Sequence, residues 1–494
     1  MKPYKIVNSD RKNKVKIIDK NTVHRSSLLV SEIPQSNVEI SMLNHFLVKR
    51  NIKNVTCKIT AIDSNGNILD NKSFELDKPQ VYVFSLSKIF QNGNTYNVEF
   101  FSSYDLFVPF PAVIINYVGK NFISQVHAYN RILNDVFEND VVNKVKVDEC
   151  CIDLNNFEET FFILCSGNNE LDDEIKLKAT TQGVVFTDSH KFSMKRFHSR
   201  KFDVSSMLNN IKINNWDGHL TISQPYQELF YGRLLIGQRY KDGAFSANHS
   251  YYDSSRTEEY WEGSKISYRL YPYLNGFENR VNIYPICSPS NLEYFIDLFN
   301  NEGSIIKSYS LGNLISPSDK FIKHLVNIEG VKENDIVSFG LKAITLDGKM
   351  PTRVTHQTVY GKGKIKCSIN SSLHNENIFR NPKYGTFTWG EIILGNEYNT
   401  ILSLSAGLLP SDFQSKYDVE LSIFSINGLI IEKKFIINGG SCLNLDMNEF
   451  IDNSASNNSH NYYWYTAVSK LQGLTAYTIS WNIKSNHCSG EHSF

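Results

Sequence analysis

The 494-residue chain has no excess of either charge, because 51 Lys and Arg residues balance 51 Asp and Glu residues. Nucleic-acid-binding proteins usually carry a basic excess, and proteins held at membrane surfaces carry polybasic segments. The balance argues against both classes, so we expect no nucleic acid among the partners. Hydrophobic residues make up 41% and charged residues 21% of the chain, a composition that excludes disorder and can supply sizeable cores.

Long apolar runs and targeting signals are also missing. The longest apolar stretch, residues 107–118, contains two prolines and is shorter than the ~20 residues that span a bilayer. The N-terminal residues contain no signal-peptide core, and neither end carries a lipidation motif. These features predict a soluble, cytoplasmic protein without membrane insertion. The eight cysteines include no CxxC pair, so we expect buried, reduced thiols rather than a disulfide framework.

Familiar catalytic motifs are absent as well. The sequence contains no GxSxG, HExxH or GxxxxGK[ST] pattern, and no GxGxxG follows a predicted strand. The acidic pairs at residues 172–173 and 258–259 are adjacent, so on a strand their side chains would point to opposite faces. That placement does not suit paired acid–base carboxylates. We therefore expect no enzyme activity, no cofactor and no metal.

Aromatic residues and asparagine are abundant instead. Aromatics make up 13% of the chain, and 53 residues are Asn. Phe and Tyr suit half-buried strands, whereas Asn suits tight turns. Helical periodicity is weak, and only residues 205–211 and 449–451 predict a turn or two of helix. The composition favours an all-β fold.

One pattern recurs four times: an alternating strand, a glycine turn, and a second strand that opens with aliphatic or aromatic residues. It occupies residues 55–76, 174–194, 293–311 and 418–437, with turns at Gly66, Gly183, Gly303 and Gly428. These glycines lie 117, 120 and 125 residues apart. Polar residues before a glycine and β-branched residues after it are a strong hairpin signal. The near-constant spacing indicates an internal repeat.

A second recurring element follows each hairpin. Residues 104–130 and 226–252 align without a gap, and looser copies occur at residues 346–360 and 485–494. Each copy brings a histidine to a similar place. These histidines are His127, His249, His356 and His492. Residues 20–29 resemble the same element, with His24 at the same point, and could complete a sheet edge.

The two elements predict units of about 110–130 residues, near the ~100 residues of a β-sandwich. The predicted fold is a tandem array of about four antiparallel β-sandwich domains with little helix. We place an N-terminal arm at residues 1–30 and the four repeats at residues 31–132, 133–256, 257–362 and 363–494.

The densest polar and aromatic cluster runs from His249 to Asp253 and is followed by Arg256. On a strand, His249, Tyr251 and Asp253 would share one face, where they could bind sugar hydroxyls or a metal ion. These three residues and Arg256 are the candidate ligand-binding residues, with His249 orienting the others. The alternative is that a repeated histidine is architectural and fixes the junction between modules.

Two further groups carry a weaker signal. His487, Cys488 and His492 lie close together near the C-terminus, but their spacing matches no zinc finger, and we expect a frayed tail. Residues 216–219 and 462–465 could offer stacking platforms to sugars, although such aromatics more often face inward along strands.

Three functions are compatible with these features. The leading hypothesis is a non-catalytic binding or assembly protein whose modules recognise a glycan or a protein partner with multivalency. The first alternative is a structural subunit of a surface layer, filament or particle, which self-associates through edge strands. The second alternative is a metal- or His-dependent enzyme with an unfamiliar site.

Overall fold

The computed structural model describes residues 24–102, 111–127, 130–132, 147–150, 159–167, 170–181, 184–207, 218–223, 229–250, 260–261, 263–283, 291–314, 321–325, 328, 330–352, 354–377, 384–451 and 458–494. Most of the elements in these ranges are antiparallel strands, and they form four β-sandwich units. The predicted fold class is confirmed.

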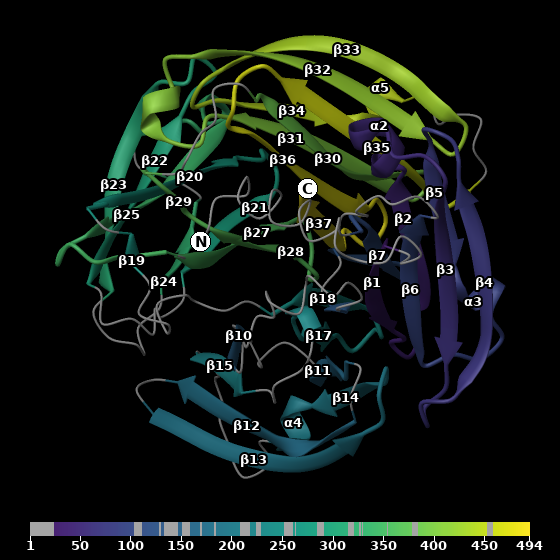
Figure 1. Ribbon diagram of the computed structural model, residues 1–494. Helices are drawn as coiled ribbons and strands as arrows, with labels where there is room; N and C mark the ends of the chain where they lie inside the picture. The colour runs from purple at the N-terminus through teal and green to yellow at the C-terminus, as the bar shows by residue number, and fades with distance from the viewer. Residues whose placement is uncertain are drawn as a thin grey trace, which may run out of the picture.

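Each unit packs an outer sheet against an inner sheet of four strands (Figure 1). In unit 1 the outer sheet contains β1 (His24–Ser31), β6 (Thr95–Ser102), β3 (Val55–Ile62) and β4 (Ile68–Leu76), and the inner sheet contains β5 (Val81–Ser85), β2 (Asn37–Leu43), β7 (Ile114–Val118) and β8 (Ile123–His127). In unit 2 the outer sheet contains β10 (Val147–Cys150), β15 (Gly218–Ser223), β12 (Leu171–Thr181) and β13 (Val184–Met194), and the inner sheet contains β14 (Ser199–Asp203), β11 (Glu159–Cys165), β17 (Leu235–Arg239) and β18 (Phe245–His249).

Units 3 and 4 follow the same strand order. In unit 3 the outer sheet contains β20 (Ile266–Pro272), β25 (Ser338–Thr345), β22 (Leu292–Phe299) and β23 (Ile305–Leu314), and the inner sheet contains β24 (Phe321–His324), β21 (Glu278–Ile283), β27 (Thr355–Gly361) and β28 (Cys367–Ser372). In unit 4 the outer sheet contains β30 (Thr386–Leu394), β35 (Asn461–Ser469), β32 (Lys416–Ser425) and β33 (Gly428–Asn438), and the inner sheet contains β34 (Cys442–Asp446), β31 (Tyr398–Ala406), β36 (Leu474–Asn482) and β37 (Cys488–His492).

A few short strands join units or extend sheets. β9 (Asn130–Ile132) and β16 (Leu229–Gly232) extend the outer sheet of unit 1 beyond β1, β29 (His374–Asn375) extends that of unit 3 beyond β20, and β19 (Tyr260–Trp261) pairs with β26 (Met350–Pro351). The short helical elements are α2 (His45–Arg50), α3 (Leu86–Ile89), α4 (Val204–Met207), α5 (Met447–Phe450), η3 (Glu333–Asp335) and η4 (Pro410–Asp412). None of the described helices has the length and apolar character that a membrane crossing requires.

The four predicted hairpins are present as the antiparallel pairs β3–β4, β12–β13, β22–β23 and β32–β33. Gly66, Gly303 and Gly428 have φ angles of 82°, 78° and 105°, a left-handed conformation that favours glycine. Gly183 lies outside the described residues. The outer member of each pair, namely β4, β13, β23 or β33, is the last strand of its sheet. We call these four the perimeter strands, because they lie around the rim of the molecule (Figure 1).

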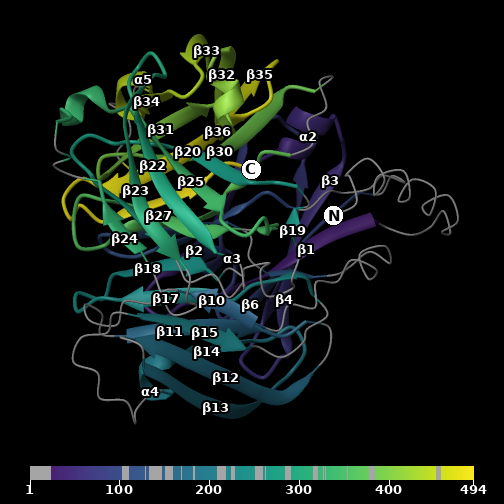
Figure 2. The same cartoon turned by 90° about the vertical axis from the view of Figure 1, so that its left-hand side faces the viewer.

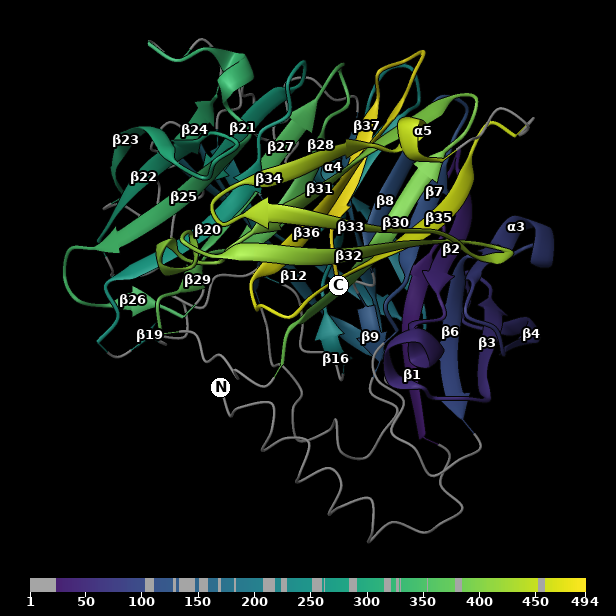
Figure 3. The same ribbon diagram turned by 90° about the horizontal axis from the view of Figure 1, so that it is seen from above.

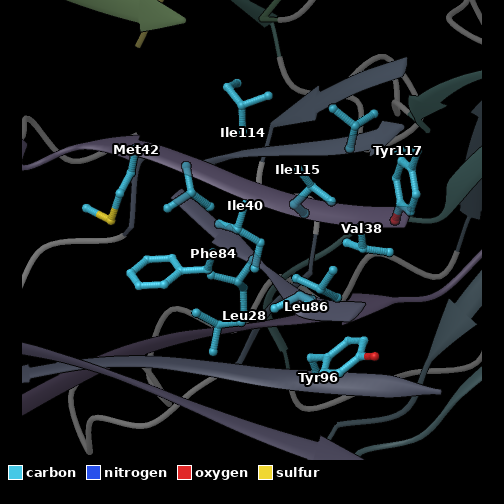
Figure 4. Packing of buried hydrophobic residues seen from close by; sticks show 14 of the residues in the cluster. Leu28, Val38, Ile40, Met42, Phe84, Leu86, Tyr96, Ile114, Ile115 and Tyr117 are labelled. Atoms are coloured by element: carbon cyan, nitrogen blue, oxygen red, sulfur yellow. The ribbon is translucent and has the colours of Figure 1, made fainter. Parts of the chain in front are cut away.

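Each sandwich is filled by the inward side chains of both sheets. In unit 1, Leu28 and Tyr96 from the outer sheet meet Ile40, Phe84 and Ile115 from the inner sheet (Figure 4). All five are at most 4% exposed. Burial of such side chains, at about 25 cal/mol per Å² of apolar surface, is the main stabilising term for each unit.

The units close into a ring. In Figures 1 and 2, unit 4 lies opposite unit 2, with units 1 and 3 between them. The hairpin turns of units 1, 3 and 4 reach the following unit. Gly66 packs on Lys195 just after β13, Gly303 packs on Gly439 just after β33, and Gly428 approaches Pro79 just after β4. Unit 4 therefore contacts unit 1 and closes the array.

Strand pairing crosses three of the predicted boundaries, and one of these pairs is β9 of predicted repeat 1 with β16 of predicted repeat 2. β1 begins within the predicted arm and pairs with β6 of unit 1. β28 begins after the boundary predicted at residue 362 and pairs with β27 of unit 3. The division into domains itself stays a prediction.

The structure also contains a helix that the sequence analysis missed. α2 begins after Asn44, whose side chain accepts a hydrogen bond from the backbone N–H of Leu47, and it ends at Asn51 with φ 52°. Asparagine is a preferred residue at both ends of a helix. The spacing of Asn44 and Asn51 could therefore have indicated this helix from the sequence. The short helices α4 and α5 confirm the two helical turns that were predicted.

Candidate functional site

Four edge strands meet at the centre of the ring. β8, β18, β28 and β37 are the final strands of the four inner sheets. β8 lies against β37 and β18, and β28 lies against the same two strands. Their sequences are ISQVH, FSANH, CSINSS and CSGEH, with serine at the second position each time. We call the meeting point of these strands the central junction.

The second-position serines bind the neighbouring strands. Ser489 Oγ of β37 accepts a hydrogen bond of 2.7 Å from the backbone N–H of Gln125 in β8. Ser124 Oγ of β8 accepts one of 2.7 Å from the N–H of Ala247 in β18. In β28, the backbone carbonyl of Ser368 accepts from the side chain of Asn248, at 2.6 Å. Short hydroxyl-bearing side chains thus replace the missing ladder bonds between edge strands of different units.

Three histidines cluster three residues further along these strands. His127, His249 and His492 occupy the fifth positions of β8, β18 and β37. The ring centroid of His127 lies 4.4 Å from that of His249 and 4.9 Å from that of His492. Units 1, 2 and 4 therefore each contribute one imidazole to the same place.

A carboxylate and a guanidinium complete this cluster. Glu491 Oε1 accepts from the backbone N–H of His127 at 2.9 Å, and Glu491 Oε2 lies 3.0 Å from His127 Nδ1. Arg233 Nη1 lies 3.0 Å from the His249 ring nitrogens and 3.5 Å from His127 Nε2. His249 Nδ1 is 2.7 Å from the carbonyl of Ser250, so that nitrogen carries the proton and Nε2 accepts from Arg233.

Burial keeps two of these imidazoles neutral. Burial, followed by the charge of Arg233, holds the pKa of His249 well below its usual value. Burial, followed by the charge of His127, lowers the pKa of His492 to about 4. Burial alone would raise the pKa of Glu491, but its contacts with His127 leave that pKa below the usual range. The junction thus holds the ionised carboxylate of Glu491 together with the neutral rings of His249 and His492 at neutral pH.

The prediction that His356 corresponds to the other three histidines is wrong. His356 lies in β27 and pairs with Ser371 of β28, so Ser371 takes the fifth position in unit 3. The ring of His356 instead contacts the hydroxyl of Tyr271 inside unit 3. Neighbouring strands of a sheet show the same alternation, so the sequence pattern does not distinguish β27 from β28.

The predicted ligand-binding group is only partly described. His249 is 4% exposed and contacts Arg233 and its neighbours in the junction, a placement that fits the architectural alternative. Tyr251, Asp253 and Arg256 lie outside the described residues, so their role as ligand-binding residues stays a prediction.

The two weaker groups have clearer outcomes. The expected frayed tail is wrong, because Cys488 and His492 belong to β37 and pair with β36. Tyr462, Trp464 and Tyr465 are 6%, 0% and 0% exposed, which confirms the inward-facing alternative. Trp216 lies outside the described residues. The cysteines at positions 57, 165, 367, 442 and 488 are free and buried, as predicted.

His127, Glu491 and His492 have the chemistry of a metal site. Their ligand atoms lie within 4.8 Å of one another, and two histidines with a glutamate are a ligand set that zinc accepts. However, both oxygens of Glu491 already accept hydrogen bonds from His127, and Arg233 places a positive charge beside the same ring. These hydrogen bonds fit a contact that holds units 1 and 4 together better than they fit a cation site.

Sequence reasoning missed a second polar contact between units 1 and 4. Glu391 of β30 is 1% exposed and accepts from Asn116 Nδ2 at 2.9 Å and from Gln125 Nε2 at 2.7 Å. Burial raises the pKa of Glu391 to about 7, although the bonds from Gln125 and Asn116 oppose that shift. The partners are 275 and 266 residues away in the sequence, so no local pattern signals the contact.

Comparison with known proteins adds little. No protein-family description matches the sequence, and no curated protein does. Among solved structures, the chain is aligned with SGBP-B from the Bacteroides ovatus mixed-linkage glucan utilization locus, solved with a heptasaccharide, at 11% identity and a TM-score of 0.12, over 89% of this chain and 92% of that one. It is also aligned with the FN1–FN3 domains of chicken CNTN1, at 9% identity and a TM-score of 0.08, over 70% and 96%. TM-scores this low carry no argument about fold or function.

Proposed function

We propose that this chain is a non-catalytic binding and assembly protein whose ring presents the perimeter strands to protein partners. The observation that carries the proposal is where the exposed aliphatic side chains lie. Seven of the thirteen large hydrophobic side chains that are exposed in the described residues lie on perimeter strands, namely Ile68, Leu69, Val185, Ile305, Leu429, Ile430 and Ile436.

Single exposed hydrophobic residues are ordinary on protein surfaces. Here they recur on the last strand of the outer sheet in all four units, with Ile68, Val185, Ile305 and Ile436 between 50% and 70% exposed. A last strand also offers a row of backbone N–H and C=O groups to another chain. Strand pairing with a protein uses both features, and four copies on one ring multiply a weak contact.

The central junction supports a non-catalytic role. The polar groups gathered there contact other units of the ring: His127 of unit 1 contacts Glu491 of unit 4, and the backbone carbonyl of His249 in unit 2 accepts a hydrogen bond from Asn370 of unit 3. Groups used in this way hold units together, and the rigid ring sets the spacing of the perimeter strands.

Assembly measured against concentration tests the proposal. The informative variant carries Ile68→Lys, Val185→Lys, Ile305→Lys and Ile436→Lys, because lysine on an edge strand opposes pairing. Sedimentation velocity should show wild-type species that grow with concentration and a variant that stays monomeric, with unchanged circular dichroism. Equal behaviour of the two proteins would contradict assembly through these strands.

A glycan partner is the other form of the binding hypothesis, with Tyr251, Asp253 and Arg256 as ligand residues. Because His249 lies in the central junction, Asp253→Ala with Arg256→Ala is the cleaner pair of changes. A saccharide on a glycan array that binds wild type and not this variant would favour the glycan form. An array without any bound saccharide would leave protein assembly as the function.

A further inference from the structure

The perimeter strand β33 carries a symmetric arrangement of outward side chains. The inference rests on the proposed assembly function and names the partner. β33 runs over eleven residues, GLIIEKKFIIN, and among the described residues it pairs only with β32. Figure 3 shows β32 and β33 crossing the side of the molecule that faces the viewer. No strand in the described part of the chain pairs with the other edge of β33, so that edge can pair with a second chain.

The register with β32 shows which side chains of β33 face away from the sandwich. Val419 and Leu421 of β32 are 1% exposed, and they pair with Phe435 and Lys433. Those positions of β33 thus lie on the core side of the sheet. Successive side chains alternate, so Glu432, Lys434 and Ile436 lie on the outward side.

This outward face is self-complementary. A two-fold axis through Lys433 would place Glu432 of one chain opposite Lys434 of the other, and the reverse pair follows by symmetry. The same axis places Ile436 opposite Ile430, at the end of the strand where a β-bulge lies. Ile430 and Ile436 are 43% and 70% exposed. Opposite charges in the middle and aliphatic side chains at both ends are favourable cross-strand pairs.

The central lysines could instead serve to keep other strands away, as edge lysines often do. Two observations argue against that reading. Lys434 has Glu432 two residues before it, so an antiparallel copy meets it with the opposite charge. Lys433, which would face its own copy, holds its ammonium 4.2 Å from the ring centre of Phe450 in its own chain. Its charge is drawn toward that ring and away from the axis.

The perimeter strand β4 lacks this symmetry. β4 has exposed aliphatic side chains only at its start, Ile68 and Leu69, and the residue opposite Ile68 in a two-fold pair about Asn71 would be Phe74, which packs on Phe84 of its own unit. We propose that two copies of this chain associate through antiparallel pairing of β33 with β33.

A matched pair of variants tests the proposal. Ile436→Lys and Ile68→Lys change the same residue type at the same exposure, 70%, on two perimeter strands. A single strand pair is a small interface, so wild type should form dimers with a roughly micromolar Kd. In sedimentation velocity, Ile436→Lys should weaken the dimer at least tenfold, and Ile68→Lys should leave it unchanged.

Charge exchange provides a second test that does not depend on lost apolar contact. Glu432→Lys and Lys434→Glu should each weaken self-association, because each places like charges opposite one another. An equimolar mixture of the two variants should recover dimers, since the lysine pair of one chain then meets the glutamate pair of the other. Thermal unfolding of each variant checks that Lys434→Glu, which also removes the bond to Glu420, leaves the chain folded.

Each other outcome has a definite meaning. Wild type that stays monomeric overturns the β33 dimer. Self-association lost in Ile68→Lys but kept in Ile436→Lys overturns it too, while assembly through perimeter strands stands. Single charge variants that stay dimeric, or a mixture that stays monomeric, exclude pairing in the register about Lys433.

Discussion

Glu391 and His492 both lie where unit 4 meets unit 1, and burial moves their pKa values in opposite directions. The pKa of His492 falls to about 4, and that of Glu391 rises to about 7. Both shifts favour the neutral form, because a buried charge loses hydration. Each shift also makes the stability of the ring depend on pH.

The histidine gives the first prediction. The pKa of His492 is lower in the fold than its usual value of 6.5, so its contribution is complete above pH 6.5 and is lost as the pH falls toward 4. His492→Gln cannot be protonated. The fall in the free energy of unfolding between pH 6.5 and 4 should shrink by up to about 3 kcal/mol in this variant. Chemical denaturation at a series of pH values measures it.

Glu391→Gln is the control with the opposite sign. The pKa of Glu391 is raised in the fold, so its contribution is present below pH 4.5 and is lost as the pH rises through 7. The curves of the two variants should therefore depart from wild type in opposite senses. Parallel curves for His492→Gln and wild type between pH 4 and 6.5 would count against a neutral His492 in the folded protein.

At the scale of elements, the hairpin turns have two structural roles. They connect a strand to its perimeter strand, and they touch the next unit. Gly303 has φ 78°, and a Cβ atom on it would lie 2.0 Å from the carbonyl oxygen of Gly439 in unit 4. Gly348 has φ 77° with no atom within 4 Å of the same position. Both glycines have a left-handed backbone conformation that strains other residues. Only Gly303 also lies against another unit.

Gly303→Ala should therefore cost more than Gly348→Ala. Both substitutions force alanine into a left-handed conformation, at about 1 kcal/mol each, and only Gly303→Ala also pushes units 3 and 4 apart. Thermal unfolding should show a clearly larger decrease of Tm for Gly303→Ala. Equal decreases would show that the turn can move away from Gly439 without loss.

At the scale of the whole molecule, the ring is closed by contacts between its first and last units. Phe494 stacks on Trp389 and Trp464 of unit 4, with ring centroids 5.8 Å and 6.2 Å away, and its ring centroid lies 6.1 Å from that of His127 in unit 1. Trp464 also donates to Ser41 Oγ of unit 1 at 2.7 Å. Side-chain packing and hydrogen bonds together hold units 1 and 4 in contact and keep the ring closed.

Phe494→Ala should loosen this closure. Phe494 contacts His127 of unit 1, and it supports Trp389 and Trp464, which contact His45 and Ser41 of unit 1. We therefore expect a larger radius of gyration in small-angle X-ray scattering at low denaturant, before the units unfold. Phe202→Ala is the matched control, since Phe202 stacks on Phe162 inside unit 2. It should lower Tm without this expansion. An equal change of radius in both variants would contradict closure through Phe494.

The local features of the fold could be predicted from the sequence. Alternation of side chains defines strands such as β3 and β32, and glycine at positive φ defines the turns between paired strands. Both signals lie within some 20 residues of chain. The all-β class, the four hairpins and the inward direction of Trp464 follow from them, since an apolar face must be buried wherever the strand is placed.

The positions of the polar residues were decided by the tertiary structure. His127 and Glu491 are 364 residues apart, and the structure brings them together because the edges of four inner sheets meet at one point. His356 shares the alternation of its neighbours yet lies in β27, one strand away from that point. Alternation reports only which face of a strand is buried. Which strands become edges, and which edges meet, depends on how the sandwiches close into a ring.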